Sequence, residues 1–367
     1  MGGPLRIGVI GVGVISAQYF AAFPRLPGLK LVAVADLDLA RAKAVAVEQH
    51  AAAMSVDELL ASDEVDVVLN LTIPAAHVPV GIQALRSGKH VYAEKPLALS
   101  VTEGRPMLDL AAELGLRVGS APDTVLGTGI QTARQLLDAG VVGRPVSAAA
   151  AWSSPGHERW HPAPGFYYQP GGGPLLDMGP YYLTALVTLL GPVERVSGAG
   201  RRSPRERTIA TGPNAGTALP VTIDTTVTAI LEHLGGAVST VSLSFDNWAT
   251  RAPTPLFELY GTAGTIAVPD PNRFEDPVEV FTAESGEWRT APPSGGYVDA
   301  ARGYGLADMA RAIETDRPHR ASGDLALHVL EIMDAVATSS EAHSSLQLQT
   351  TVARPEAVPE GATPDTW

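Results

Sequence analysis

The stretch that decides the fold is "RIGVIGVGVIS", Arg6–Ser16. A short apolar run ends at Gly11 and Gly13, and a helical pattern follows directly. Glycines at such a turn allow a tight bend and let a pyrophosphate approach the backbone N–H groups that open the helix. A simple tight turn in a glycine-rich protein is the alternative interpretation, and Ser16 stands where the fingerprint has glycine or alanine. On the nucleotide interpretation, the phosphate contacts are Gly11, Gly13, Val14 and Ile15.

A carboxylate follows the second predicted strand. Asp36 lies in "ADLDLARA", near the offset of roughly 20 residues at which an acid binds the ribose hydroxyls of a dinucleotide. A carboxylate there repels a 2′-phosphate and favours NAD, whereas Arg41 could pair with a 2′-phosphate and keeps NADP open. The alternative role of Asp36 is a helix N-cap, which Asp38 could equally serve.

The order of apolar patterns predicts two domains. The first third alternates strands, at 6–10, 31–35, 65–71, 90–93 and 116–119, with helices at 14–23, 39–49, 56–61, 76–87 and 101–114, which is typical of an α/β doubly wound parallel sheet. A helix at 125–139 is followed by alternating segments at 222–233, 237–245, 257–260 and 279–282, with Gly235 and Gly236 as a hairpin turn. Further helices are expected at 180–190, 305–315 and 323–340. We therefore expect a Rossmann domain at 1–122, an α+β domain with a large, mostly antiparallel open sheet at 123–345, and a tail at 346–367 that is unstructured from Arg354.

Composition excludes several classes of protein. A length of 367 residues fits two domains, and 45% apolar with 18% charged residues describes a globular chain. The formal net charge of −13 and the lack of a Lys/Arg run argue against nucleic acid and anionic membranes as partners. No cysteine is present, which excludes thiol chemistry and suits a cytoplasmic location. No uninterrupted apolar run reaches the roughly 18 residues of a transmembrane helix.

A lysine stands at an unusual place in "GKHVYAEKP", residues 88–96. The strand at 90–93 runs directly into Glu94 and Lys95, and Pro96 restricts the backbone of the lysine. Open α/β sheets bind ligands at the carboxyl ends of their strands, so we expect Lys95 to face that edge. Glu94 is interpreted either as a hydrogen-bond partner of the cofactor ribose or as a simple partner of Lys95.

Five segments in order, "GVIGVGVIS", "ADLD", "NLTIPAAH", "ALRSGKHVYAEKPLA" and "PGGGPLLDMGPYY", resemble the glucose-fructose oxidoreductase, inositol dehydrogenase and MocA family (Gfo/Idh/MocA). The resemblance extends from about Leu5 to Ser340. It implies a Rossmann domain, a second domain whose open sheet often forms a homodimer or homotetramer interface, and redox chemistry on sugars, inositols or related polyols with a nicotinamide cofactor.

The resemblance also implies roles for single residues. It places Lys95 beside the nicotinamide and the substrate hydroxyl, and Asp177 in the substrate pocket. Tyr181 stands where many members have a histidine acid or base, and Thr184 where many have a second Asp. "APDTVLG" lacks the Asn/Arg pattern of many members, which leaves the substrate open. The residues implied to line the cofactor are Thr72, Ile73, Pro74 and His77.

Oxidation of a secondary alcohol needs a base and a group that stabilises the alkoxide. Lys95 can supply the positive charge, and Tyr181 can supply the base if a nearby ammonium lowers the pKa of its phenol from about 10. Asp177 would keep Lys95 charged and oriented. The alternative is that Tyr181 is a packing residue and that Asp177 caps the helix.

An aromatic segment at 152–173, "WSSPGHERWHPAPGFYYQPGGG", joins ring faces to hydrogen-bond donors, a combination that suits a sugar ring. Packing of this loop on the sheet domain is the alternative. His157 and His161 have the spacing of a helical metal site, but the prolines around them argue against a helix, so no metal is expected. His161 is the reserve candidate for the base. Candidate substrate contacts are Trp152, His157, Trp160, His161 and Tyr181.

Three functions remain at this point. The leading one is an NAD(P)-dependent oxidoreductase acting on CH–OH groups of a sugar, inositol or polyol. The second is a glycoside hydrolase that oxidises its substrate transiently with bound NAD to permit elimination. The third is a non-catalytic nicotinamide-binding sensor, against which the coexistence of Lys95, Asp177 and Tyr181 counts. The sugar and its reacting carbon stay open.

Overall fold

The computed structural model describes residues 3–203, 205–251 and 255–364. Backbone contacts divide the chain into two compact units, the first drawn from Met1–Thr128, Gly295–Leu327 and Pro355–Trp367, and the second from Gly129–Ser294 and His328–Arg354. The first crossing lies close to the expected boundary at 122. The later crossings were not expected, because hydrophobic patterning does not tell which unit a returning segment packs against.

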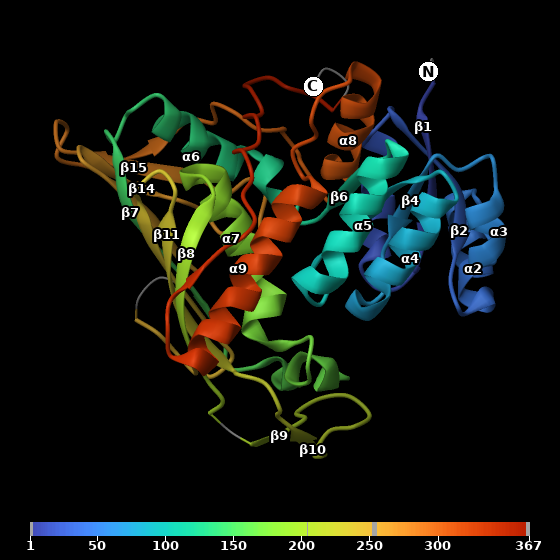
Figure 1. Ribbon diagram of the computed structural model, residues 1–367, viewed down its shortest axis with the longest axis horizontal. Coiled ribbons are helices and arrows are strands. Elements are labelled where there is room, and N and C mark those ends of the chain that lie inside the picture. Colours follow the sequence, from blue (N-terminus) through green and yellow to red (C-terminus); the bar gives the residue numbers. More distant parts are fainter. Residues whose placement is uncertain (1–2, 204, 252–254, 365–367) are drawn as a thin grey trace. The chain divides into compact units, whose positions relative to one another are not determined.

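The first unit contains a parallel sheet of six described strands in the order β3-β2-β1-β4-β5-β6 (Figure 1). The strands are β1 (Leu5–Ile10), β2 (Leu29–Ala35), β3 (Ala52–Met54), β4 (Val67–Asn70), β5 (His90–Ala93) and β6 (Val118–Ser120). This order is that of the doubly wound dinucleotide-binding fold, so the expected α/β class is confirmed. Strand β3 was missed because its alanine-rich sequence lacks the β-branched residues that mark a strand.

Helices of the first unit begin where the sequence supplies caps. Ser55 and Glu58 form a capping box at α3, and the Ser100 hydroxyl accepts the N–H of Glu103 at α5, so both begin where the pattern predicts. The described helices are α1 (Ser16–Ala22), α2 (Leu39–Gln49), α3 (Val56–Ala61), α4 (Pro74–Arg86), α5 (Val101–Leu114) and α8 (Tyr304–Thr315), with 3₁₀ turns at Phe23–Arg25 and Thr124–Leu126.

The carboxyl ends of four central strands lie in register. Ile10, the last residue of β1, is paired with Ala35 at the end of β2 and with Asn70 at the end of β4. Asn70 is in turn paired with Ala93 at the end of β5. The residues that follow these ends therefore share one edge of the sheet, the edge at which such sheets bind ligands.

The second unit contains a mixed sheet of nine described strands in the order β16-β15-β14-β13-β7-β12-β11-β8-β17. Most pairs are antiparallel, as expected, but β7 and β12 run parallel. The strands are β7 (Pro145–Ser153), β8 (Val193–Arg201), β11 (Thr226–His233), β12 (Val238–Ser244), β13 (Leu256–Gly261), β14 (Gly264–Ala267), β15 (Val278–Thr282), β16 (Trp288–Ala291) and β17 (Leu346–Gln347), with β9 (Glu206–Thr208) and β10 (Ala218–Pro220) as a separate ribbon.

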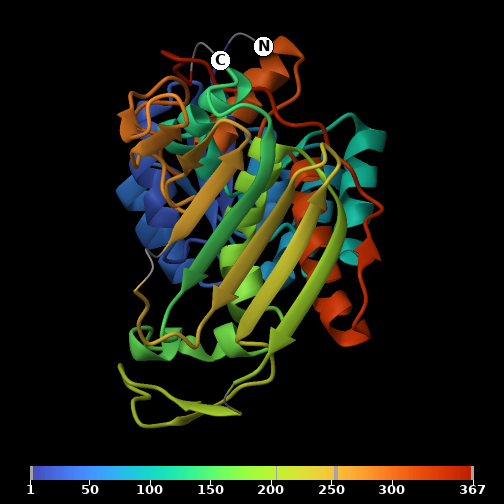
Figure 2. The same cartoon turned by 90° about the vertical axis from the view of Figure 1, so that its left-hand side faces the viewer.

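Helix α7 (Gly173–Leu190) packs on the centre of this sheet, against β7, β11 and β12. The other helices that belong wholly or mainly to this unit are α6 (Thr128–Asp138) and α9 (Gly323–Ala342). Figure 2 looks onto the opposite face, where the strands lie in front of α7. The hairpin expected at Gly235 and Gly236 joins β11 to β12, with Gly236 at a φ of 85°.

From Arg354 the described part of the C-terminal tail forms no helix or strand, as expected, but the tail is packed, which was not expected. Leu346 and Gln347 pair with β8, and Val358 is fully buried. The Arg320 guanidinium donates to the carbonyls of Glu356 and Ala357 at 2.8 and 3.1 Å. Proline removes backbone donors but leaves carbonyl acceptors, so a proline-rich segment can be held by arginine side chains without forming a strand or helix.

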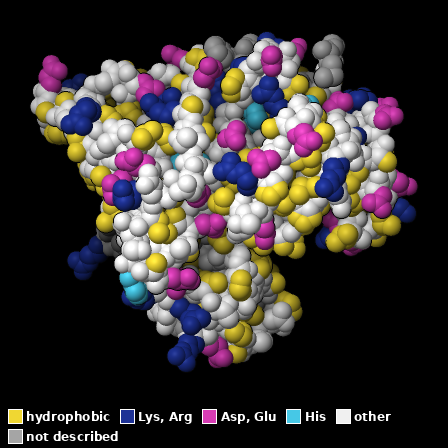
Figure 3. All heavy atoms as spheres, in the orientation of Figure 1, with side chains coloured by type: hydrophobic (Ala, Val, Ile, Leu, Met, Phe, Trp, Pro, Cys, Tyr) yellow, Lys and Arg dark blue, Asp and Glu magenta, His cyan; other side chains and the backbone are white. Residues whose placement is uncertain are grey.

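On the face shown in Figure 3, Asp and Glu side chains are interspersed with Lys and Arg.

Among the described helices, none is both long enough and apolar enough to cross a bilayer.

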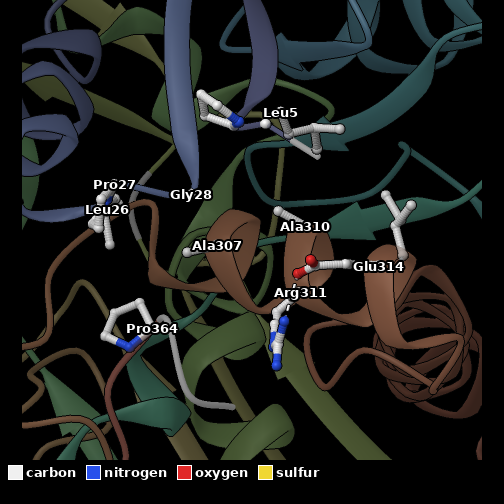
Figure 4. Close-up of a pocket in the computed structure, with 12 residues that line it drawn as sticks. Leu5, Leu26, Pro27, Gly28, Ala307, Ala310, Arg311, Glu314 and Pro364 are labelled. Atoms are coloured by element: carbon white, nitrogen blue, oxygen red, sulfur yellow. Dashed lines mark hydrogen bonds and ion pairs between the residues drawn. The ribbon is translucent and has the colours of Figure 1, made fainter. Parts of the chain in front are cut away.

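A cavity of about 560 Å³ lies in the first unit at the amino end of β1 (Figure 4). Leu5, Leu26 and Ala307 line it, and an ion pair between Arg311 and Glu314 lies at its wall. None of the described candidate catalytic, cofactor-binding or substrate-binding residues lines this cavity. Because it lies at the amino end of the strand, it is separate from the ligand-binding edge of the sheet.

Candidate functional site

The glycine loop has the geometry that its sequence predicts. Gly11 has a φ of 94°, and a Cβ there would lie 2.8 Å from the backbone of Leu71, so no other residue fits without a shift. A Cβ on Gly13 would meet nothing within 4 Å, so this glycine borders open space. Ser16 donates its hydroxyl to the Gly13 carbonyl at 2.7 Å, which gives the departure from the fingerprint a local role.

Asp36 and Asp38 have separate tasks. Asp38 is the N-cap of α2 and accepts the N–H groups of Ala40 and Arg41. The buried Asp36 accepts the Val12 N–H at 2.9 Å with one oxygen, and the Asp38 N–H and the Arg41 guanidinium with the other. Burial alone would raise the pKa of Asp36, but these hydrogen bonds outweigh it and hold the pKa below its ordinary value. The capping alternative for Asp36 was therefore wrong.

The turn after β4 exposes Ile73 and holds its neighbours in place. The Asn70 side-chain oxygen accepts both the N–H and the hydroxyl of Thr72, at 3.2 and 2.6 Å. Ile73 is 70% exposed, and Pro74 opens α4. His77 is buried under this turn, and burial lowers the pKa of its imidazole. Asn70 was missed as a site residue, although its place at the end of a buried strand is a signal that sequence reasoning could use.

Lys95 follows the carboxyl end of β5. Its backbone N–H donates to one oxygen of Glu94 at 3.1 Å, and the buried Tyr19 hydroxyl donates to the other at 2.8 Å. Burial and the Glu94 charge raise the pKa of Tyr19. Glu94 is thus a buried partner of Lys95, in agreement with the second interpretation, but it binds the backbone N–H of the lysine, and Tyr19 was missed.

These residues fit a dinucleotide. The glycine loop, Asp36, the Thr72–Pro74 turn and Lys95 follow the ends of β1, β2, β4 and β5, whose last residues are in register. Gly13 leaves open space beside the first residues of α1, and the exposed side chains of Val14 and Ile73 flank the same edge. The cofactor prediction of the sequence therefore has a matching surface in the first unit.

In the second unit, a histidine and a carboxylate meet. His157 Nε2 lies 2.9 Å from Asp177 Oδ2, and Trp160 Nε1 lies 3.3 Å from His157 Nδ1. An indole N–H can only donate, so Nδ1 accepts and Nε2–H donates to Asp177. Both residues are among those that the sequence analysis expects near the substrate. Their contact with each other was not predicted, because they are 20 positions apart in the sequence.

Asp177 and Tyr181 lie on one face of α7, since four residues make about one helical turn. The helix begins at Gly173, so Asp177 lies inside it and does not cap it. It begins seven residues earlier than expected, because Pro180 is tolerated within it. Tyr181 is 6% exposed.

Aromatic rings surround His157. The ring centroids of Tyr167 and Phe245 lie 4.3 and 4.4 Å from its own, and that of Trp152 lies 6.1 Å away. Trp160 is 58% exposed and stacks edge-on with His161 at 5.3 Å. Several rings of the aromatic segment therefore pack the loop, as the packing alternative expects, while the contact of this segment with a substrate stays a prediction.

A buried ionic cluster beneath His157 was not predicted. Glu158 accepts the Tyr168 hydroxyl and pairs with Arg207 at 3.0 Å, and Arg207 also pairs with Asp246. The Tyr168 oxygen accepts the His157 backbone N–H at 3.0 Å. The cluster fixes the backbone of His157, and its members are too far apart in sequence for a motif to reveal it.

No group of three or more His, Cys, Asp or Glu residues arranged to hold a metal ion occurs in the described part of the chain.

Comparisons with known proteins identify both domains. Residues 5–121 match the oxidoreductase family, NAD-binding Rossmann fold, and residues 130–267 match the GFO/IDH/MocA C-terminal domain. A dTDP-3,4-didehydro-2,6-dideoxy-alpha-D-glucose 3-reductase of Streptomyces violaceoruber is 35% identical over 215 residues, which cover 58% of this chain and 62% of that relative. A trans-1,2-dihydrobenzene-1,2-diol dehydrogenase of Bos taurus is 28% identical over 316 residues, 84% of this chain and 87% of the relative.

Among solved structures, apo levoglucosan dehydrogenase superposes with a TM-score of 0.81 at 22% identity, covering 95% of this chain and 100% of that one. Its complex with NADH and L-sorbose gives a TM-score of 0.80 at 22% identity, covering 94% and 99%. Both structures therefore share the fold of this chain. From the two matched domains, the chain belongs to the Gfo/Idh/MocA family of oxidoreductases, and NAD is the cofactor of its Rossmann domain.

Proposed function

We propose that the chain transfers a hydride between nicotinamide and a secondary hydroxyl or carbonyl of a sugar, inositol or related polyol. The observation that carries the proposal is the register of the strand ends that bring the glycine loop, Asp36 and Lys95 to one edge of the sheet. The sugar class is supported by the rings and donors around His157 and by relatives named for sugar substrates.

NAD, when bound, supplies the hydride acceptor or donor. Lys95 supplies a positive charge that stabilises the alkoxide as the hydroxyl proton leaves. Tyr181 acts as the acid or base for that proton, the role that the resemblance to the Gfo/Idh/MocA family implies for its position. Asp177, whose carboxylate accepts a hydrogen bond from Nε2–H of His157, also holds a hydroxyl of the substrate.

The preference between cofactors follows from Asp36. Its ionised carboxylate can accept the two adenosine ribose hydroxyls and repels a 2′-phosphate. Arg41 partly neutralises it at 2.7 Å, so we propose a preference for NAD with measurable use of NADP.

A substrate panel tests the reaction. Monosaccharides, anhydro sugars, inositols and aryl glycosides would be incubated with NAD or NADP, and both nicotinamide absorbance and aglycone release would be read. We expect stoichiometric reduction of NAD with at least one sugar or polyol. Aglycone release without net reduction of NAD would instead support a glycoside hydrolase. No change in nicotinamide absorbance and no aglycone release, with normal NADH binding, would support a sensor.

Two substitutions with neighbouring controls test the residue roles. Lys95→Ala and Tyr181→Phe should each lower kcat by about a hundredfold or more while NADH binding changes little. The exposed Lys43→Ala and the adjacent Tyr182→Phe should retain turnover, because Tyr182 donates to Asp270 at 3.4 Å and has no assigned catalytic role. Near wild-type turnover in both Lys95→Ala and Tyr181→Phe would reject the assignment.

We also propose that the chain forms a homo-oligomer through the open face of the second-unit sheet. The middle of this face is small and uncharged, since Thr228 pairs with Ser242, Ile230 with Thr240, and Thr240 with Ala149. Glu232, opposite Val238, and Glu258, opposite Ala149, add charge beside it. Ile230 and Val238 on this face are 48% and 40% exposed, which is typical of a surface that packs against a partner. Sedimentation equilibrium should give a dimer or tetramer mass, and a monomer mass would reject the proposal.

A further inference from the structure

Both ring nitrogens of His77 face backbone carbonyls. The side chain is 1% exposed and lies in the first turns of α4. Nδ1 is 2.7 Å from the carbonyl oxygen of Pro96, and Nε2 is 3.1 Å from that of Thr72. One imidazole therefore bridges the residue after Lys95 and the first residue of the turn that follows β4.

The two bridged segments are each fixed on their other side. The side-chain oxygen of Asn70 accepts the N–H and the hydroxyl of Thr72. The side-chain amide of Asn70 donates to the His77 carbonyl at 3.1 Å. Glu94 accepts the Lys95 N–H and is itself held by Tyr19. Pro96 has no N–H, so its carbonyl is the backbone group through which a side chain can hold this residue.

The proton on the ring decides which contact is the stronger. A carbonyl oxygen only accepts, and a neutral imidazole has one N–H, so a neutral ring donates to one of the two carbonyls. The shorter contact assigns the proton to Nδ1 and the hydrogen bond to Pro96. Burial lowers the pKa of His77, in agreement with a neutral ring.

We infer that His77 is a positioning residue that holds the Lys95–Pro96 segment against the Thr72–Pro74 turn, chiefly through Nδ1–H and the Pro96 carbonyl. The resemblance of this chain to its family had placed His77 among the residues that line the cofactor, but its burial and its two carbonyl partners give it a different task. Its effect on turnover rests on the role proposed for Lys95.

Two amide variants separate the two contacts. The amide nitrogen of Asn reaches about as far from the backbone as Nδ1, and that of Gln about as far as Nε2. His77→Asn can therefore keep the bond to Pro96, and His77→Gln can keep the bond to Thr72. The exposed His50→Asn is the matched control, because asparagine suits its left-handed backbone conformation.

Three quantities would be measured on the full chain: NADH affinity by fluorescence titration, kcat on the panel sugar with the highest turnover, and the rate of Lys95 reductive methylation in the absence of substrate, read by peptide mass spectrometry. We expect His77→Gln to lower kcat by about tenfold to a hundredfold and to speed Lys95 methylation by at least about threefold, with NADH affinity within about threefold. His77→Asn and His50→Asn should stay within about threefold of wild type in all three.

Equal effects of Asn and Gln on Lys95 methylation, or a larger effect of Asn, would overturn the inference. Because methylation is measured without substrate, its result is independent of the proposed reaction. If Lys95→Ala proves fully active while Gln and Asn still differ in Lys95 methylation, the positioning contact stands and the proposed catalytic role falls.

Discussion

The variant Asp36→Asn should reverse the order of cofactor preference. The two oxygens of the Asp36 carboxylate accept two backbone N–H groups and a guanidinium. Asparagine has only one oxygen, so its N–H₂ group faces the donors that the other carboxylate oxygen accepted. A ribose hydroxyl that loses its hydrogen bond to the charged carboxylate loses about 1.5–3 kcal/mol of binding free energy. NADH should therefore bind about tenfold to a hundredfold more weakly to the variant. NADPH should bind more tightly, because the repulsion of its 2′-phosphate is removed and Arg41 is released.

The same variant should lose about 1–3 kcal/mol of stability at neutral pH through the unsatisfied donor. Folding lowers the pKa of Asp36 below its ordinary value, so the ionised carboxylate stabilises the protein above the ordinary pKa of about 4. This contribution is lost as the pH falls through the lowered pKa. The stability gap between wild type and variant should therefore shrink in acid, as measured by urea unfolding at several pH values.

Fluorescence titration with NADH and NADPH measures the preference. Asp38→Asn is the matched control, since it removes a nearby charge while the amide oxygen keeps the helix cap. An unchanged NADH to NADPH ratio in Asp36→Asn, or an equal change in the control, would refute the assignment of Asp36.

Other substitutions test the second unit and the assembly. His157→Phe preserves the ring packing but removes the donor to Asp177, so it should raise KM for the panel sugar by about tenfold with little change in NADH affinity; an unchanged KM would argue against a substrate role. Arg207→Met leaves buried carboxylates unpaired and should cost about 3–5 kcal/mol in chemical denaturation, against less than about 1 kcal/mol for the exposed Arg289→Met; equal costs would contradict the buried cluster. Ile230→Glu should shift the sedimentation mass toward the monomer, and an unchanged oligomer mass would place the interface elsewhere.

The nucleotide half of the fold could be predicted from local sequence. Strand-to-helix alternation, the glycine loop and the caps at Ser55 and Ser100 act over a few residues, so the element bounds of α2, α3 and α5 agree with the structure. The edge position of Lys95 follows from one rule, that parallel strands place their carboxyl ends together.

Long-range pairings could not be predicted. The contact of His157 with Asp177, the Glu158 and Arg207 cluster, and the bridge from His77 to Pro96 all join residues that no short motif links. The return of residues 295–327 to the first unit depends on contacts such as the Asp123 carboxylate accepting the N–H groups of Gly303 and Gly305, at 2.8 and 3.1 Å. Single-sequence patterns report burial along the chain but not the partner that causes it.

Hydride transfer from a sugar carbon to the nicotinamide can be followed with deuterium. A panel sugar deuterated at its carbinol carbons would be incubated with NAD and wild-type protein, and the free reduced cofactor would be examined by mass spectrometry. We expect one deuterium per reduced nicotinamide, and a rate of transfer lowered by about a hundredfold or more in Lys95→Ala. Reduced cofactor without deuterium, or the same rate of transfer in Lys95→Ala, would contradict this expectation.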